Sequence, residues 1–169
     1  ASSQYEGGYD LDGKGLDTQD CRPYLKRTSD ATTATRLLTR DVIDEAKKCQ
    51  GIGNYPFRKG SDGYHHIDED IALLKELGID IYRFSISWAR LYPQGDELEP
   101  TKKGIAFYDH IFKEVHKAGM KIFLTMNHYA VPLYLVENYG GWTNRKLVTF
   151  YERFARTVFE HWGQYIDYF

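Results

Sequence analysis

The clearest alternation of hydrophobic and polar positions lies in residues 81–88. Bulky apolar side chains occupy every second position: Tyr82, Phe84, Ile86 and Trp88. Arg83, Ser85 and Ser87 occupy the positions between them. A period of two is typical of a β-strand, whose successive side chains point to opposite faces. We therefore predict a strand whose apolar row faces helices, while Arg83, Ser85 and Ser87 face a polar interior.

Arg83 is the residue of this strand that indicates most about the surroundings of the strand. Burying a guanidinium is costly unless a carboxylate and further hydrogen bonds satisfy it. We therefore expect an acidic partner for Arg83 and a polar site where the strand ends. The alternative is an edge strand with Arg83 in solvent, because arginine is usually exposed.

The segments before and after this strand have apolar residues at helical spacing. A stripe of Ile67, Ile71, Leu74 and Leu77 predicts a helix that ends at Gly78, with Asp68, Glu69 and Asp70 in its first turn. Further stripes predict helices over residues 41–49, over 105–118 and over 145–161. A second strand is predicted over residues 121–128, and another begins within residues 164–169.

Strands that alternate with helices predict a parallel sheet with right-handed crossovers. A doubly wound dinucleotide-binding sheet would carry a G-x-G-x-x-G turn, and this chain has none. Polar and aromatic residues instead follow both strands, as at the catalytic end of a barrel. The prediction is an α/β fold, the N-terminal part of a (β/α)8 barrel. Residues 1–169 form one partial domain, and residues 10–60 form a long irregular loop insertion within it.

Composition narrows the function classes. The 22 basic and 24 acidic residues are nearly balanced, so neither nucleic acid nor a membrane is an expected partner. Cys21 and Cys49 have no metal-ligand or redox spacing, and a reducing, cytoplasmic setting is expected. His65 and His66 lie close to three acidic residues, but helix capping explains those acids better than a metal does. No metal or cofactor is predicted.

Two further features are candidates for binding. His128 ends the second predicted strand, where a structural role and a catalytic-face role are both open. Gly140, Gly141 and Trp142 predict a tight loop anchored by an indole, with a sugar-stacking platform as the alternative.

Four motifs occur in order along the chain: QYEG at residues 4–7, YRFSISW at 82–88, TMNH at 125–128 and YGGWTNR at 139–145. Together they resemble the successive signatures of family 1 glycoside hydrolases. LVENYGGW at residues 135–142, NRKL at 144–147 and Tyr129 are most similar to the bacterial 6-phospho-β-glucosidase branch. Ala130 departs from the acidic residue that relatives usually carry there.

The resemblance implies an enzyme that hydrolyses β-glucosides with retention of configuration, and the branch resemblance implies that these β-glucosides are 6-phosphorylated. It implies that Gln4, His128 and Tyr129 bind the sugar and that Arg83 supports the catalytic nucleophile. Retention requires two carboxyl groups. Both catalytic glutamates are expected beyond Phe169, because Glu97, Glu99 and Glu137 match neither motif and are predicted in loops. This chain alone is therefore predicted to be inactive, as the N-terminal part of a longer enzyme.

Two alternatives stay open: an unphosphorylated β-glucosidase or β-galactosidase of the same family, and a non-catalytic sugar-binding fragment. Four cations in the early loop are candidate phosphate ligands by charge alone, although a solvated surface is their more ordinary role: Arg22, Arg27, Arg36 and Lys59. The aglycone and the oligomeric state are left open.

Overall fold

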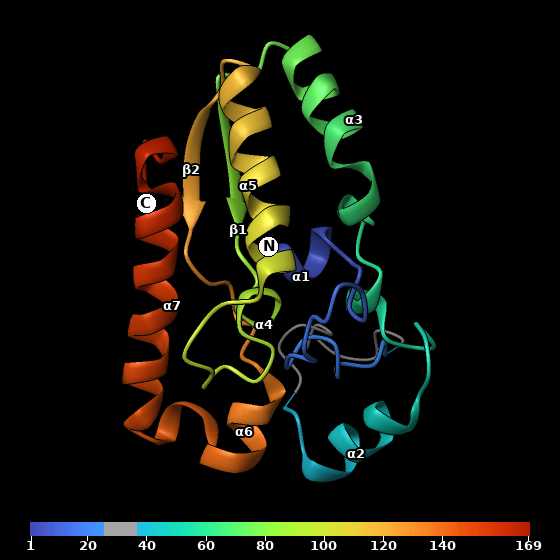
Figure 1. Cartoon of the computed structure of the whole chain (residues 1–169). Helices are drawn as coiled ribbons and strands as arrows, with labels where there is room; N and C mark the ends of the chain where they lie inside the picture. Colours follow the sequence, from blue (N-terminus) through green and yellow to red (C-terminus); the bar gives the residue numbers. More distant parts are fainter. Residues whose placement is uncertain (26–36) are drawn as a thin grey trace.

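Two parallel strands, β1 (Ile81–Ser85) and β2 (Lys121–Thr125), pair in register from Ile81 opposite Lys121 to Ser85 opposite Thr125. The computed structural model describes residues 1–25 and 37–169. Both arrows in Figure 1 point to the same end of the molecule, where α1, α4 and α6 lie. The predicted parallel arrangement is confirmed.

Helices precede, connect and follow the two strands. In chain order they are α1 (Ser2–Tyr5), α2 (Arg40–Lys48), α3 (Gly63–Glu76), α4 (Trp88–Leu91), α5 (Lys102–Lys117), α6 (Leu133–Tyr139) and α7 (Lys146–Trp162). Short 3₁₀ turns span Pro56–Arg58, Gly141–Thr143 and Gly163–Tyr165. Figure 1 shows α5 in front of the strands, between α3 and α7.

Helix α5 shows how local sequence produces one of these elements. The Thr101 side chain accepts a hydrogen bond from the Gly104 N–H and caps the first turn. Tyr108, Phe112 and Val115 recur at helical spacing and are buried against the sheet. Gly119, with φ +83°, takes the left-handed conformation just past the end of the helix.

Aromatic contacts dominate the core between β1, α5 and α7. The Phe112 ring stacks on Trp162 with centroids 5.2 Å apart and meets the edge of Phe84 at the same centroid distance. Trp88 stacks on Phe154 at 5.6 Å. Burying these rings removes a large apolar area from water, which is the main favourable term in folding.

Three predicted boundaries are wrong. The strand ends at Ser85, because Ser87 precedes α4 and Trp88 is buried as the first residue of that helix. The strand predicted over residues 121–128 ends at Thr125. Beyond α7 the chain forms a 3₁₀ turn, and then only a parallel bridge joins Tyr168 to Phe123 of β2.

Two residue placements also need correction. Helix α3 begins at Gly63, so Asp68, Glu69 and Asp70 lie beyond its first turn, which contains no acidic residue. The acids therefore lie too far from the helix N-terminus for the dipole to stabilise them strongly. Glu137 lies within α6 rather than in a loop, where it pairs with Lys47 at 2.8 Å.

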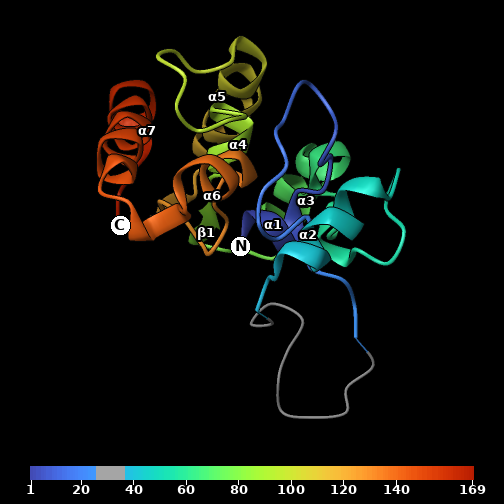
Figure 2. The ribbon, with the colours of Figure 1, turned by 90° about the horizontal axis from the view of Figure 1, so that it is seen from below.

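The described part of residues 10–60 is more ordered than an irregular loop. It contains α2 at nearly the predicted bounds, and its Cys21, Ile43, Ala46 and Tyr55 form a second, smaller core with Leu133 of α6. Figure 2 views the end toward which the strands point, with α2 and α3 on the side opposite α7. The early segment therefore packs against the end of the barrel strands where functional groups were predicted.

Candidate functional site

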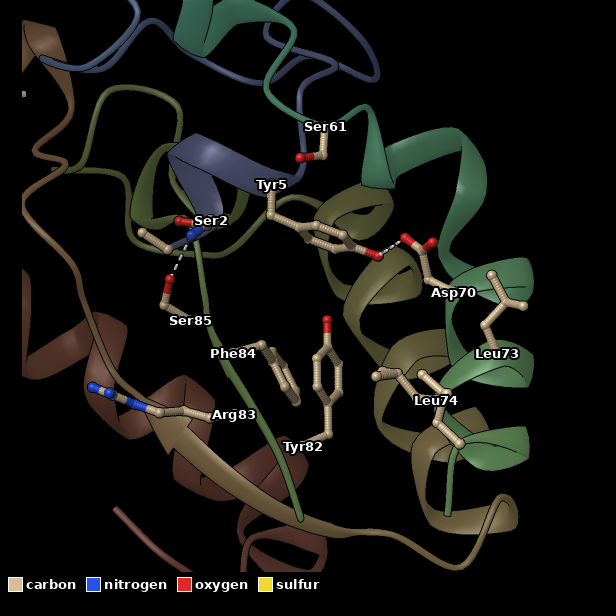
Figure 3. Close-up of a pocket in the computed structure, with 12 residues that line it drawn as sticks. Ser2, Tyr5, Ser61, Asp70, Leu73, Leu74, Tyr82, Arg83, Phe84 and Ser85 are labelled. Atoms are coloured by element: carbon tan, nitrogen blue, oxygen red, sulfur yellow. Dashed lines mark hydrogen bonds between the residues drawn. The ribbon is translucent and has the colours of Figure 1, made fainter. Parts of the chain in front are cut away.

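Helix α1 lies directly at the carboxyl end of β1. The Ser2 N–H donates to the Ser85 Oγ at 2.6 Å, and Figure 3 shows this bond joining the two elements. Gln4 follows in the same helix with an exposed side chain, while its carbonyl accepts from the Ser61 N–H at 3.1 Å. The Gln4 backbone is therefore held beside the carboxyl end of β1, and its side chain is exposed.

Arg83 lies on the opposite face of β1 from Tyr82 and Phe84, so the predicted alternation is confirmed (Figure 3). Its Nε donates to the Thr125 Oγ1 at 3.1 Å, and its guanidinium lies 5.2 Å from the Phe123 ring centroid. The expected burial is wrong, because Arg83 is exposed and forms no ion pair within residues 1–25 and 37–169. No element of the described chain covers this face of the two strands there.

His128 and Tyr129 follow β2 and lie together. Their rings meet edge to face with centroids 4.7 Å apart. Partial burial lowers the pKa of His128, and the positive charge of Arg83 lowers it further. The imidazole is therefore neutral at pH 7, and it can both donate and accept a hydrogen bond.

The structure thus places Arg83, His128 and the start of α1 at the same end of the strand pair: α1 bonds to Ser85 of β1, Arg83 bonds to Thr125 of β2, and His128 follows Thr125. Tyr129 adds an aromatic ring that is 71% exposed. An aromatic face, a neutral imidazole, an amide and a guanidinium suit a polyhydroxylated ligand, which offers hydroxyl groups and an apolar ring face.

A buried network behind this site was not predicted. The Glu6 carboxylate accepts from the Arg90 Nε at 3.0 Å and from the Tyr108 hydroxyl at 2.6 Å. Tyr108 also accepts from the Ser87 N–H at 2.7 Å. Arg90 donates to the Gly7 carbonyl at 3.0 Å, and its guanidinium lies beside the stacked rings of Tyr64 and Phe107, 4.7 and 4.9 Å from their centroids. The network ties the segment after α1 to the residues that follow β1.

A second buried ionic cluster lies in the early segment. The Lys14 Nζ contacts the Asp20 Oδ2 at 2.6 Å and the Asp17 Oδ2 at 3.2 Å, and all three side chains are at most 5% exposed. Burial and the neighbouring Asp17 carboxylate raise the pKa of Asp20 to about 6. Burial disfavours the Lys14 charge, but the two carboxylates outweigh it and raise the pKa of Lys14. Both networks join residues whose local sequence gives no sign of the pairing.

A cavity of about 490 Å³ lies between α1, α3 and β1. Tyr5, Tyr82 and Leu74 line it, and the Tyr5 hydroxyl donates to the Asp70 carboxylate at 2.5 Å (Figure 3). None of Gln4, His128 and Tyr129 lines this cavity. Arg83 is the one candidate ligand-binding residue that lines it.

Trp142 has the first of the two roles considered for it, the anchor of a tight loop. Gly140, with φ +77°, ends α6, and the Trp142 indole then contacts Trp88 and Tyr151 at centroid distances of 6.0 and 5.4 Å. The predicted anchored loop is confirmed. The indole is still 53% exposed, so stacking on a sugar stays a prediction.

The remaining candidates are the histidines considered for a metal site and the cations considered for phosphate binding. His65 pairs with Asp62 at 2.7 Å and His66 with Glu69 at 3.4 Å, and no cluster within the described ranges could hold a metal ion. Arg27 and Arg36 lie outside the described residues, Lys59 is exposed and Arg22 is partly buried. In the part of the chain that the structure describes, no helix has the length and apolar character needed to span a membrane.

Comparison with known proteins finds relatives that match nearly the whole chain. A phospho-cellobiase of Klebsiella oxytoca is 43% identical over 162 residues, covering 96% of this chain and 32% of the relative. The 6-phospho-beta-glucosidase AscB of Escherichia coli is 39% identical over 168 residues, covering 99% of this chain and 34% of the relative. The chain therefore spans about a third of the length of these relatives.

A crystal structure of a rice beta-glucosidase superposes with a TM-score of 0.76 at 28% identity, over 99% of this chain and 30% of the rice protein. The predicted fold is confirmed: the chain is an incomplete part of a (β/α)8 barrel. The profile of glycosyl hydrolase family 1 matches residues 1–169. This chain therefore belongs to glycosyl hydrolase family 1.

Proposed function

We propose that the chain is part of a retaining glycosidase that hydrolyses 6-phospho-β-glucosides. The observation that carries the proposal is the placement of Arg83, His128 and the α1 segment at the carboxyl ends of β1 and β2: α1 bonds to Ser85, Arg83 bonds to Thr125, and His128 follows Thr125. Barrel enzymes place their catalytic groups at this end. The phospho-specific part rests on the 39–43% identity to a phospho-cellobiase and a 6-phospho-beta-glucosidase.

Each candidate residue receives a role from its chemistry. A neutral His128 and the amide of Gln4 bind hydroxyl groups of the sugar at the cleaved bond, and Tyr129 lines the same pocket. Arg83 projects from the face that Phe123 and Thr125 share, where its charge stabilises a nucleophilic carboxylate supplied by the rest of the enzyme.

The carboxylates of the described chain are poor candidates for the two catalytic groups. Glu6 is 4% exposed and is held by Arg90 and Tyr108. Glu97 accepts from the backbone N–H groups of Gln94 and Gly95, and Glu137 pairs with Lys47. Retaining hydrolysis needs a nucleophile and an acid/base about 5 Å apart, so both are assigned beyond Phe169.

The test compares matched aryl β-glucosides, with and without the 6-phosphate, on the full-length enzyme. Two or three charge-assisted phosphate contacts at about 1.5–3 kcal/mol each should separate the kcat/KM values by several orders of magnitude. Comparable kcat/KM values would favour the plain β-glucosidase instead, the activity named for the rice structure that this chain resembles. Absence of turnover of both substrates would contradict the glycosidase assignment.

A further inference from the structure

Tyr129 has an unusual backbone conformation. Its φ is +70°, in the left-handed region that bulky side chains rarely adopt. Such a conformation costs free energy and persists only where the surroundings impose it. The ring is 71% exposed, so packing of the side chain does not supply that restraint.

The restraint comes from Thr18, 111 residues earlier in the chain. The Thr18 N–H donates to the Val131 carbonyl at 3.0 Å, and the Val131 N–H donates back to the Thr18 Oγ1 at 3.2 Å. The same hydroxyl donates to the Tyr129 carbonyl at 3.5 Å. Thr18 therefore binds the backbone at Tyr129 itself and two residues beyond it.

Neighbouring backbone contacts extend this clamp. Asp17 and Pro132 form an antiparallel bridge, and the Leu133 N–H donates to the Leu16 carbonyl at 2.8 Å. The two segments 16–18 and 131–133 thus run beside each other as a short ladder. Thr18 lies at the end of this ladder that is nearest to Tyr129 and His128.

The clamp has a rigid support behind it. The Asp17 Oδ1 accepts from the N–H groups of Gln19 and Asp20, at 2.8 and 3.2 Å. The Asp20 Oδ2 accepts from the Asp17 N–H at 3.0 Å, and Lys14 bridges both carboxylates. Because these groups are buried and mutually satisfied, the turn that presents Thr18 has little freedom to move.

We infer that Thr18 is a positioning residue for sugar binding: it fixes the left-handed backbone of Tyr129 and thereby the placement of the Tyr129 and His128 side chains. The inference rests on the proposed function for its effect on catalysis. The structural part of the inference, that Thr18 restrains the backbone of residues 128–131, does not depend on that function.

The experiment uses two variants of the full-length enzyme. Thr18→Val keeps the branched shape and removes the hydroxyl, whereas Thr18→Ser keeps the hydroxyl. Thr143→Val is the matched control, because the Thr143 hydroxyl also donates to a loop carbonyl, that of Gly140, at 2.8 Å. Hydrogen exchange of peptides covering residues 127–132 and kcat/KM on the preferred β-glucoside are measured for each.

Losing one hydroxyl that bonds twice should raise exchange in residues 127–132 about tenfold and lower kcat/KM about tenfold in Thr18→Val. Thr18→Ser and Thr143→Val should match the unaltered enzyme in both measurements. Unchanged exchange in Thr18→Val would overturn the clamp. Faster exchange with unchanged kcat/KM would overturn the positioning role. An unaltered enzyme inactive on every β-glucoside would contradict the proposed function instead, and the exchange data would still decide whether the clamp exists.

Discussion

At the scale of single residues, the Glu6–Arg90 pair is the most consequential contact. Both side chains are nearly fully buried, at 5% and 2% exposure. Taking the two charges out of water is costly, and only mutual pairing with further hydrogen bonds offsets that cost. Tyr108 and the Gly7 carbonyl supply those bonds. The pair therefore fixes the segment that follows Gln4 relative to the residues that follow β1.

Glu6→Gln should lower the free energy of unfolding by about 3–5 kcal/mol, because it leaves the Arg90 charge buried without a counterion. Glu137→Gln is the control: its partner Lys47 is 44% exposed, and a solvent-exposed pair contributes about 0–1 kcal/mol. Urea unfolding of both variants measures the difference. Equal losses for the two variants would contradict this account of the Glu6–Arg90 pair.

A second prediction at this scale concerns His128. Burial and the charge of Arg83 hold its pKa below the ordinary value. Arg83→Gln removes one positive charge, so the pKa of His128 should rise, although burial keeps it from returning fully. Arg83→Lys keeps the charge and should leave the pKa low. NMR titration of the His128 ring protons gives both values, and an unchanged pKa in Arg83→Gln would show that Arg83 does not act on the imidazole.

At the scale of elements, local patterns predicted the helices well. The stripes of α5 and α7 are visible in the sequence because residues three and four apart share one helical face. The alternation through Trp88 misplaced the strand end, because the same spacing continues after Ser85 into the turn and short helix α4. Period-two spacing alone does not mark where a strand stops.

No local sequence pattern predicted the contacts that shape the site. Glu6 and Arg90 lie 84 residues apart, and Thr18 and Tyr129 lie 111 apart. Neither glycine nor asparagine marks the left-handed backbone at residue 129, so no sequence signal predicted it. Strand patterns singled out Arg83 and His128, and resemblance added Gln4 and the role of each residue, whereas the groups that hold them in place become visible only in three dimensions.

The prediction for the early segment concerns the Lys14–Asp17–Asp20 cluster. The native pKa of Asp20, about 6, exceeds its value of about 3.9 in the unfolded chain. Between these pH values the native state binds the additional proton, so this residue's contribution to stability is present below pH 4 and is lost as pH rises through 6. Relative to Asp20→Asn, the unaltered chain should lose about 2–3 kcal/mol of unfolding free energy between pH 4 and pH 7.

Urea unfolding at several pH values measures this difference between the two proteins. Comparing them cancels the titration of groups that do not interact with Asp20. A difference that stays constant, or that grows in favour of the unaltered chain as pH rises, would contradict the raised pKa of Asp20.

At the scale of the whole molecule, the described chain supplies only one side of a proposed active site. It supplies Gln4, Arg83, His128 and Tyr129 around the ends of two paired strands. Leu73, Leu77 and Ile81 are 50%, 75% and 45% exposed near β1. Apolar side chains beside a strand edge favour further packing, which the relatives, about three times as long, have the length to provide.

The last prediction follows because this chain supplies only part of the proposed active site. The isolated 169-residue chain should not turn over any aryl β-glucoside, phosphorylated or plain. Double displacement needs one carboxylate to attack the sugar and one carboxylic acid to protonate the leaving group. Hydrogen bonds from Gln4 and His128 can orient a sugar, but they supply neither group. Glu6 cannot substitute, because Arg90 and Tyr108 hold it in the interior.

The assay measures aryl alcohol release by the purified chain, with the full-length enzyme as the positive control under the same conditions. If the activity stays proportional to the amount of purified chain through successive chromatography steps, a catalytic carboxylate must lie within residues 1–169. The assignment of both catalytic groups beyond Phe169 would then be wrong. Glu97→Gln and Glu99→Gln would be the first variants to examine, since both side chains lie in the loop between α4 and α5.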